Sequence, residues 1–297
     1  MRVLPAMLLG AGYGTRLRPL TDRHAKAMVP VGDRPLLGHL LSRLRACGAP
    51  RIVINVHHCG GDIQRFLRDD PGVGVSVERE LLGTAGGIAW AGPLLGSGDV
   101  VVWNADILAD VDVAGLAVAH ACDGADPAAT LVVRHRPRRE GPVGVDAAGR
   151  VVRLRDECVA DEASGADFLG VQVLGHRLRA RLPRQGCLVR DVYIPALRSG
   201  AFLRAFPHAS GFFDIGTPRR YLEANLAWLA GRSAAQWAAP GSRIAPGVEV
   251  RDAIVGPGAS IGGRGVFERS VAWPGARASA PISDAIVVDD QVVFVGS

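Results

Sequence analysis

The chain has almost no lysine. Of its 34 lysines and arginines, Lys26 alone is a lysine. A compact ammonium on a flexible stem reaches a single oxygen in a way that the planar fork of arginine does not, so a retained lysine is informative. Lys26 follows a glycine-rich stretch at residues 10–16 that ends in Arg16. This combination indicates a polyphosphate site; the alternative is a lysine left by chance in an arginine-biased sequence.

Cysteine pairs and long apolar runs are also missing. The five cysteines are odd in number and scattered, with no C-x-x-C spacing, which argues against a disulfide framework and favours reduced thiols in the cytoplasm. No run approaches the roughly 18 apolar residues of a membrane span, so we expect no membrane partner. The apolar stretch at residues 1–9 leads into the glycine loop without a cleavage site, and we expect a core strand there instead of a signal peptide.

The basic balance of the chain is not accompanied by a nucleic-acid motif. The net charge is +5, and the arginines are dispersed apart from a run at residues 134–139. Such a run is typical of a solvated loop. We therefore expect no nucleic-acid partner, and an anionic small-molecule substrate accounts for the charge equally well.

The first 232 residues alternate between strand and helix patterns. The predicted strands are Val3–Leu9, Arg51–Val56, Gly74–Val77, Val100–Trp103 and Ala129–Arg134, and the predicted helices are Pro35–Cys47, Gly61–Arg68, Ala85–Leu95, Val113–Ala121 and Arg219–Leu229. This rhythm is typical of an α/β, Rossmann-like, mixed but mostly parallel sheet. The Gly10 loop, His57-His58 and residues 104–106 each follow a strand, so we expect them to meet at one edge of the sheet.

A different texture begins at Ile244. Residues 244–248, 254–262 and 271–276 repeat small aliphatic residues and glycine at a spacing close to six, which predicts a parallel β-helix of about two to three coils. We therefore divide the chain into a domain at 1–232, a linker at 233–243 and a coil domain at 244–297. Residues 233–297 contain neither His nor Cys, which argues against an acyltransferase with a histidine base and favours a structural or homo-oligomer-forming role.

The glycine loop matches neither of the common phosphate motifs. A G-x-G-x-x-G would place glycine where Thr15 stands, and the Gly-Lys-Ser/Thr of a Walker A is absent, which disfavours dinucleotide oxidoreductases and P-loop ATPases. What remains is GAGYGTRLRPLT at residues 10–21, followed by Lys26. Its glycines let backbone N–H groups approach phosphate oxygens closely.

This signature resembles that of the sugar-1-phosphate nucleotidyltransferases, and among them the mannose-1-phosphate guanylyltransferase-like branch. The resemblance extends to LGTAGG at residues 82–87, Asn-Ala-Asp at 104–106 and FDIGTP at 213–218, and covers essentially the whole chain. Many members carry a short C-terminal left-handed parallel β-helix, so the resemblance implies that fold for residues 244–297.

The resemblance also implies roles for individual residues. Arg16 and Lys26 bind and activate the nucleoside triphosphate as catalytic residues, together with Asp106. Asp106 and Asp214 hold a divalent metal, for which Mg²⁺ is expected; taken singly, they are equally well explained as a helix N-cap and a turn residue. The nucleotide-binding residues are Leu9, Gly10, Ala11, Gly12, Gly14, Thr15, Glu80, Gly83 and Thr84, with Glu78 as an alternative to Glu80 near the base.

Gly144 and Gly170 are expected to line the sugar pocket by the same resemblance, although Gly170 in a strand also serves close packing. Many relatives carry Glu-Lys-Pro there, with the lysine on the sugar phosphate. This chain has RLRDEC at residues 153–158 and no lysine, which leaves Arg153 or Arg155 as a substitute and the acceptor sugar open. His57-His58-Cys59 is interpreted as a structural group at a strand end in preference to a zinc site, because no further ligands are evident.

The predicted reaction joins a nucleoside triphosphate and a sugar 1-phosphate into an NDP-sugar and pyrophosphate. The sugar phosphate oxygen attacks the α-phosphorus in line, so no enzyme nucleophile is needed. The LGTAG segment and nearby carboxylates that accept from guanine favour GTP, with mannose 1-phosphate or a related manno-configured sugar. The alternatives are a UTP- or dTTP-dependent transferase and a regulatory subunit that binds NDP-sugar without turnover.

Overall fold

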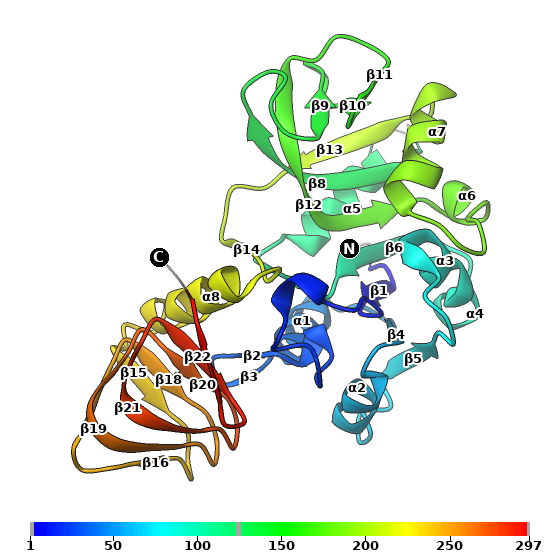
Figure 1. Ribbon diagram of the computed structural model, residues 1–297. Coiled ribbons are helices and arrows are strands. Elements are labelled where there is room, and N and C mark those ends of the chain that lie inside the picture. The colour runs from blue at the N-terminus through cyan, green and yellow to red at the C-terminus, as the bar shows by residue number, and fades with distance from the viewer. Residues whose placement is uncertain (1–2, 123–125, 296–297) are drawn as a thin grey trace. The chain divides into compact units, whose positions relative to one another are not determined.

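The computed structural model describes residues 3–122 and 126–295 (Figure 1). The chain forms two compact units that are interleaved along the sequence. The first contains Met1–Gly12 and Leu40–Phe212, and the second contains Tyr13–His39 and Phe213–Ser297. The glycine-rich signature is therefore divided between the two units. The division at 1–232, 233–243 and 244–297 drawn from the sequence stays a prediction.

The first unit is built on a ten-stranded sheet with a parallel centre. The central strands are β6 (Val100–Asn104), β1 (Ala6–Leu9), β4 (Ile52–Val56) and β5 (Val73–Val77), which pair in that order. Their near-continuous apolar runs are typical of parallel strands that are covered on both faces. The helices between these strands and after them are α1 (Leu36–Ala46, whose first turn belongs to the second unit), α2 (Gly60–Phe66), α3 (Gly83–Trp90), α4 (Gly92–Leu95) and α5 (Val113–Ala121).

Antiparallel strands extend this sheet. The long strand β12 (Ser164–Leu174) is antiparallel to β6, β8 (Ala129–Arg136) and β9 (Val143–Val145). The remaining elements are β7 (Ile107–Ala109), β10 (Val151–Leu154), β11 (Glu157–Cys158), β13 (Leu203–Pro207), α6 (His176–Arg179), α7 (Ile194–Arg198) and the π-helix Leu188–Tyr193. The α/β class and its large mixed sheet are confirmed.

The single helix predicted at Ala85–Leu95 is wrong. The structure has two helices, α3 and α4, which are separated at Ala91. Pro93 explains the break, because it has no N–H to donate and its ring clashes with a carbonyl in the preceding turn of a continuous helix. The apolar periodicity persists across the break, which is why the pattern does not reveal it.

The second unit joins the signature segment to the C-terminal part of the chain. It holds the 3₁₀ turns Thr15–Leu17 and Lys26–Met28, the hairpin of β2 (Pro30–Val31) and β3 (Arg34–Pro35), β14 (Phe212–Asp214, which crosses from the first unit) and α8 (Pro218–Ala230). Helix α8 begins where sequence rules place a start: Pro218 is in its first turn, and the Thr217 hydroxyl accepts from the Arg220 N–H at 3.3 Å. It lies against β2, β18 and β22.

Apart from the last strand pair, which is antiparallel, the C-terminal strands form two parallel ladders. Gln236 pairs with Ala253, Ile254 with Val271 and Val271 with Ile286 in one ladder. The strands are β15 (Gln236–Ala238), β16 (Arg243–Ile244), β17 (Val248–Arg251), β18 (Ala253–Val255), β19 (Ser260–Glu268), β20 (Val271–Ala272), β21 (Arg277–Ser283), β22 (Ala285–Val288) and β23 (Gln291–Phe294). We call residues 236–294 the coil. Parallel pairing between successive turns is what a β-helix requires, and the left-handed β-helix itself stays a prediction.

The hairpin after Lys26 is tied to α8 by a glycine. The Gly32 N–H donates to Asn225 Oδ1 at 2.9 Å, and Asn225 is fully buried. Gly32 has a φ of 62°, and a Cβ at this position would lie 2.0 Å from the Trp228 ring. Only glycine therefore fits both the backbone conformation and the space.

Gly32→Ala should lower the thermal midpoint by at least several degrees. A left-handed non-glycine residue costs about 1–3 kcal/mol before any clash, and Trp228 must also move. Differential scanning calorimetry measures the shift. Gly61→Ala is the matched control, since Gly61 lies in α2 with nothing within 4 Å. Equal thermal midpoints for Gly32→Ala and Gly61→Ala would contradict a stabilising contact between Gly32 and α8.

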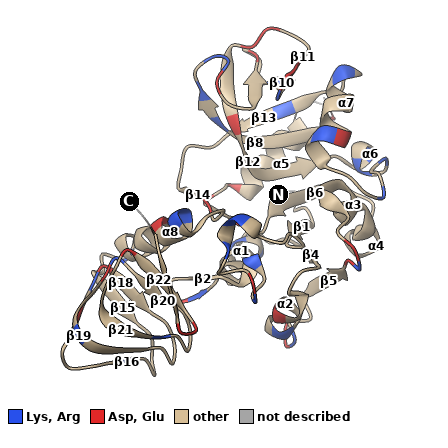
Figure 2. Cartoon of the chain, viewed as in Figure 1, with Lys and Arg blue, Asp and Glu red and all other residues tan. Residues whose placement is uncertain are grey.

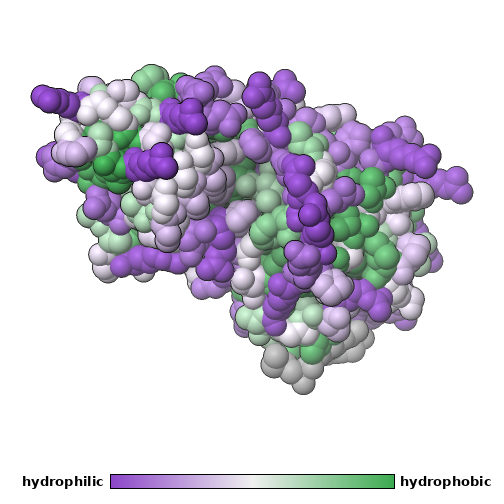
Figure 3. All heavy atoms as spheres, turned by 90° about the horizontal axis from the view of Figure 1, so that it is seen from below, coloured by the Kyte–Doolittle hydropathy of each residue, from purple (hydrophilic) through white to green (hydrophobic). Residues whose placement is uncertain are grey.

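The surface shows charges of both signs. Basic and acidic residues are dispersed along the elements of both units (Figure 2). Hydrophilic side chains cover much of the face drawn in Figure 3, with hydrophobic areas between them. No helix among the described residues is long and apolar enough to cross a membrane.

Candidate functional site

Three predicted segments meet at the carboxyl edge of the parallel strands in the first unit. Leu9, the last residue of β1, pairs with Asn55 of β4 and with Asn104 of β6. The Gly10 loop, His57-His58 and Asp106 therefore leave neighbouring strands at the same edge, as the sequence predicts. Asp106 is partly exposed there, and the Ala105 N–H before it donates to the Leu9 carbonyl at 3.1 Å.

A buried asparagine–glutamate pair braces the Gly10 loop. The Gly10 N–H donates to Asn55 Oδ1 at 2.8 Å, and Asn55 Nδ2 donates to Glu78 Oε1 at 2.6 Å. Glu78 Oε2 accepts from the Leu82 N–H at 3.0 Å, so both carboxylate oxygens are engaged. Glu78 is 3% exposed, whereas Glu80 is on the surface. Glu78 is thus a support for two loops, and of the two carboxylates only that of Glu80 is exposed to solvent.

The LGTAGG segment needs its glycines for close packing. A Cβ on Gly83 would lie 2.5 Å from the Gly186 carbonyl oxygen, and one on Gly86 would lie 2.5 Å from that of Arg184. The Thr84 hydroxyl accepts from the Leu188 N–H at 2.7 Å. The start of α3 is therefore fixed against residues 184–188, a contact that sequence reasoning did not foresee.

The second unit holds Arg16 beside Asp214. Gly14 has a φ of 64°, and its carbonyl accepts from the Thr21 hydroxyl at 2.8 Å. A Cβ on Gly216 would lie 3.3 Å from an Arg16 guanidinium nitrogen and 2.9 Å from Asp214 Oδ1. Because glycine has no Cβ, that space is left beside the carboxylate. Arg220 holds the other oxygen, Asp214 Oδ2, at 2.7 Å.

Gly170 and Gly144 both have packing reasons in the structure. Gly170 has a φ of 72°, and a Cβ there would lie 2.8 Å from Asn104 Nδ2. A Cβ on Gly144 would lie 1.9 Å from a Glu162 carboxylate oxygen. The structure thus explains both glycines by close packing against a neighbouring side chain. Their role in sugar binding stays a prediction.

Arg153 is not available to replace the missing sugar-pocket lysine. Its Nε donates to Glu162 Oε2 at 2.6 Å, and its other nitrogens donate to Glu162 and to the carbonyls of Gly141, Val143 and Arg155. The Glu162 side chain is 5% exposed. Of the two arginines considered from the sequence, the exposed Arg155 is left as the candidate.

The Arg153 guanidinium, with the Arg139 N–H, holds the pKa of the Glu162 carboxyl below its ordinary value of 4.5 despite burial. A depressed carboxyl pKa stabilises the fold above the ordinary value, and this contribution is lost as the pH falls through the lowered pKa. Urea unfolding between pH 3 and pH 7 should therefore show a smaller acid-induced loss of stability in Glu162→Gln than in the parent chain. The exposed Glu140→Gln is the control, and an identical pH profile for all three proteins would contradict the assignment.

His57 and Cys59 have local partners. His57 Nδ1 donates to the Glu78 carbonyl at 3.0 Å, and the Cys59 thiol lies 3.3 Å from His58 Nε2. Burial raises the pKa of the Cys59 thiol. No group of three His, Cys, Asp or Glu residues suited to a metal ion occurs among residues 3–122 and 126–295.

Residues 5–231 match the family model described as nucleotidyl transferase. The chain belongs to the nucleotidyl transferase family. A mannose-1-phosphate guanylyltransferase of Mycobacterium tuberculosis is 30% identical to this nucleotidyl transferase over 292 residues, covering 93% of this chain and 81% of the relative. An N-acetylmuramate alpha-1-phosphate uridylyltransferase of Neisseria meningitidis serogroup B is 43% identical over 114 residues, or 37% of this chain and 49% of the relative.

Solved structures share the fold of this nucleotidyl transferase. HddC from Yersinia pseudotuberculosis, complexed with GMP-PN, superposes with a TM-score of 0.64 at 22% identity. The match covers 76% of this chain and 100% of that one.

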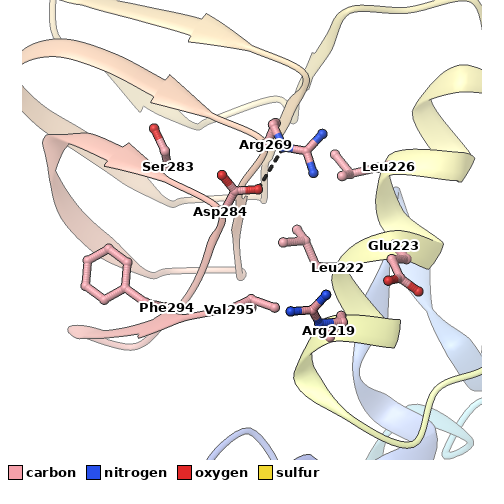
Figure 4. A pocket seen from close by; sticks show the side chains of 9 residues that line it. All are labelled: Arg219, Leu222, Glu223, Leu226, Arg269, Ser283, Asp284, Phe294 and Val295. Carbon is pink, nitrogen blue, oxygen red and sulfur yellow. Dashed lines mark hydrogen bonds and ion pairs between the residues drawn. The ribbon is translucent and has the colours of Figure 1, made fainter. Parts of the chain in front are cut away.

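A separate hollow of about 540 Å³ lies in the second unit of the nucleotidyl transferase (Figure 4). Arg219, Leu222 and Leu226 of α8 face Arg269 and Asp284 of the coil, with Phe294 near the chain end. Arg269 Nε donates to Asp284 Oδ1 at 2.7 Å. Because acidic groups offset the arginines and no signature residue lines it, we do not assign the polyphosphate to this hollow.

Proposed function

We propose that this nucleotidyl transferase transfers a guanylyl group from GTP to mannose 1-phosphate or a related manno-configured sugar phosphate. The products are a GDP-sugar and pyrophosphate. The observation that carries the proposal is the similarity, over 93% of the chain, to a mannose-1-phosphate guanylyltransferase. The retained signature residues support catalysis over the alternative of a regulatory subunit without turnover.

The chemistry assigns a role to each charged residue. Arg16 and Lys26 neutralise the triphosphate, and Lys26 lies on the phosphoryl oxygens that gain charge as pyrophosphate leaves. Asn55 holds the Gly10 N–H, and the loop that follows offers the backbone N–H groups of Ala11, Gly12, Gly14 and Thr15 to the phosphates, next to Leu9. Glu80, Gly83 and Thr84 lie near the base. The sugar phosphate oxygen attacks the α-phosphorus directly, so the protein orients the reactants and forms no covalent intermediate.

Divalent metal ions are general in this family, and we propose Mg²⁺ held by Asp106 and Asp214. Glycine at 216 places no Cβ against Asp214 Oδ1, while Arg220 binds the other oxygen, and a carboxylate oxygen is a ligand that Mg²⁺ accepts. Mg²⁺ prefers few protein oxygens with water and phosphate. When bound, it neutralises charge on the phosphates.

Two further proposals concern the setting of the protein. Strand β21 lies at the edge of its sheet, where it pairs with β19 on one side. An open strand edge favours pairing with a second copy of the chain, and therefore a homo-oligomer. The described cysteines are free thiols, which suits the cytoplasm, where nucleoside triphosphates and sugar phosphates are available.

The test measures pyrophosphate release with Mg²⁺ for GTP, UTP, dTTP, CTP and ATP against the 1-phosphates of mannose, glucose, N-acetylglucosamine and heptose. GTP with a manno-configured sugar should react fastest, and Lys26→Ala should lower that rate by about a hundred- to a thousandfold. Turnover with UTP or dTTP instead would replace the base assignment, which the partial similarity to a uridylyltransferase keeps open. Nucleotide binding without turnover for any pair would support the regulatory subunit.

A further inference from the structure

The coil makes direct contact with the segment that carries Lys26. The His24 ring lies 5.4 Å, centroid to centroid, from the ring of Trp273, which follows β20. The Arg23 guanidinium also lies 3.7 Å from Asp289 of the coil. That ion pair is exposed and contributes little, so the ring contact is the part of this junction that can hold a fixed geometry.

Trp273 connects three parts of the second unit. Its indole is 4% exposed and lies 6.1 Å, centroid to centroid, from the ring of Tyr221 in α8, which is fully buried. The three rings therefore run from the signature segment through the coil to α8. A buried indole between two other rings has little freedom to move, because protein interiors are packed as densely as crystals.

Lys26 follows this contact by two residues. Ala25 and Ala27 on either side of it are each 1% exposed, so the backbone is packed while the lysine side chain remains partly exposed. Beyond Lys26, Gly32 bonds to Asn225 of α8 at 2.9 Å. The segment is thus held on both sides of Lys26 by residues from the last third of the chain.

We propose that Trp273 is a positioning residue, through which the coil fixes the Lys26 segment for phosphate binding. Trp273 does not touch substrate; it acts through His24. The coil then contributes to the reaction, in addition to its proposed role in forming a homo-oligomer. This inference rests on the proposed function for its kinetic consequence, whereas the fixing of the segment can be measured without turnover.

The experiment compares Trp273→Ala, Trp273→Phe and Phe267→Ala in the full-length protein. Phe267 is a fully buried aromatic residue of the same coil, so its removal controls for loss of coil packing. Hydrogen–deuterium exchange follows the Met28 and Val29 amides, which donate to Ala25 and Lys26 at 2.8 and 3.3 Å. Residues 52–56 of β4 serve as the internal reference.

Trp273→Ala should speed exchange at residues 24–31 by at least about tenfold and leave β4 unchanged, while Trp273→Phe keeps the slow exchange. With substrates, kcat should fall about ten- to a hundredfold in Trp273→Ala, since a small misplacement of a charged group is costly. In a His24→Ala background, Trp273→Ala should have little further effect on kcat, because the contact is already lost.

Equal acceleration at residues 24–31 in Phe267→Ala, or additive effects of His24→Ala and Trp273→Ala, would overturn the proposal. The exchange result also separates it from the proposed function. If no substrate pair turns over, faster exchange in Trp273→Ala alone still supports the positioning of the segment, and unchanged exchange refutes it.

Discussion

Lys26→Ala should lower kcat by about a hundred- to a thousandfold, with little change in thermal stability. A single preorganised cationic donor at a site of developing charge has an effect of this size. The Lys26 side chain is partly exposed, so its removal leaves no large cavity. Steady-state pyrophosphate release measures kcat, and calorimetry checks the fold.

Lys26→Arg tests why a lysine is kept there in an arginine-rich chain. The planar fork spreads its charge over several donors, so we expect Lys26→Arg to recover less than about a tenth of the lost rate. Arg23→Ala is the matched control: its side chain is 82% exposed in its ion pair with Asp289, so activity should hold. Full activity in Lys26→Arg would show that the lysine is an accident of composition.

Glu78→Ala should cost about 2–4 kcal/mol of unfolding free energy and raise the KM for the nucleoside triphosphate. The substitution leaves the buried Asn55 amide and the Leu82 N–H without their acceptor, and each orphaned donor costs about 1–3 kcal/mol. Because Asn55 in turn holds the Gly10 N–H, the loop loses its brace as well. Urea unfolding and steady-state kinetics measure the two effects.

Glu78→Gln separates acceptance of hydrogen bonds from side-chain volume. The carboxylate accepts at both oxygens, whereas glutamine presents one oxygen and one NH₂, so one donor meets another donor. Glu78→Gln should therefore recover less than half of the unfolding free energy that Glu78→Ala loses. Glu80→Gln, on the surface, should leave stability unchanged. A destabilised Glu80→Gln and an unaffected Glu78→Gln would reverse the assignment.

The sequence predicts what depends on local pattern. Apolar runs locate the central strands, and the rule that ligands lie at carboxyl ends brings the Gly10 loop and Asp106 to one edge correctly. Packing in the interior cannot be predicted in this way. Glu78 and Glu80 are two residues apart and equally acidic, and only burial shows that the first is a brace. From the sequence, Arg153 could bind a ligand phosphate. The structure shows instead that its guanidinium is paired with Glu162, nine residues further along the chain.

Long-range pairing is the other part that sequence reasoning misses. Nothing in the GAGYGTRLRPLT signature indicates that residues 13–39 pack with the C-terminal part of the chain. Gly32 in this segment has an obvious role in a turn, while its tie to Asn225 depends on the fold of α8. Contacts of this kind leave no periodicity in either partner.

The interleaving of the two units has a consequence for biosynthesis. Gly32 and Asn225 are 193 positions apart, and at about 5–20 residues per second the ribosome takes on the order of 10–40 s to deliver the second after the first. During that interval, strand β2, whose Val31 is fully buried in the finished protein, lacks its contacts with α8. The nascent chain then exposes apolar surface next to its only lysine.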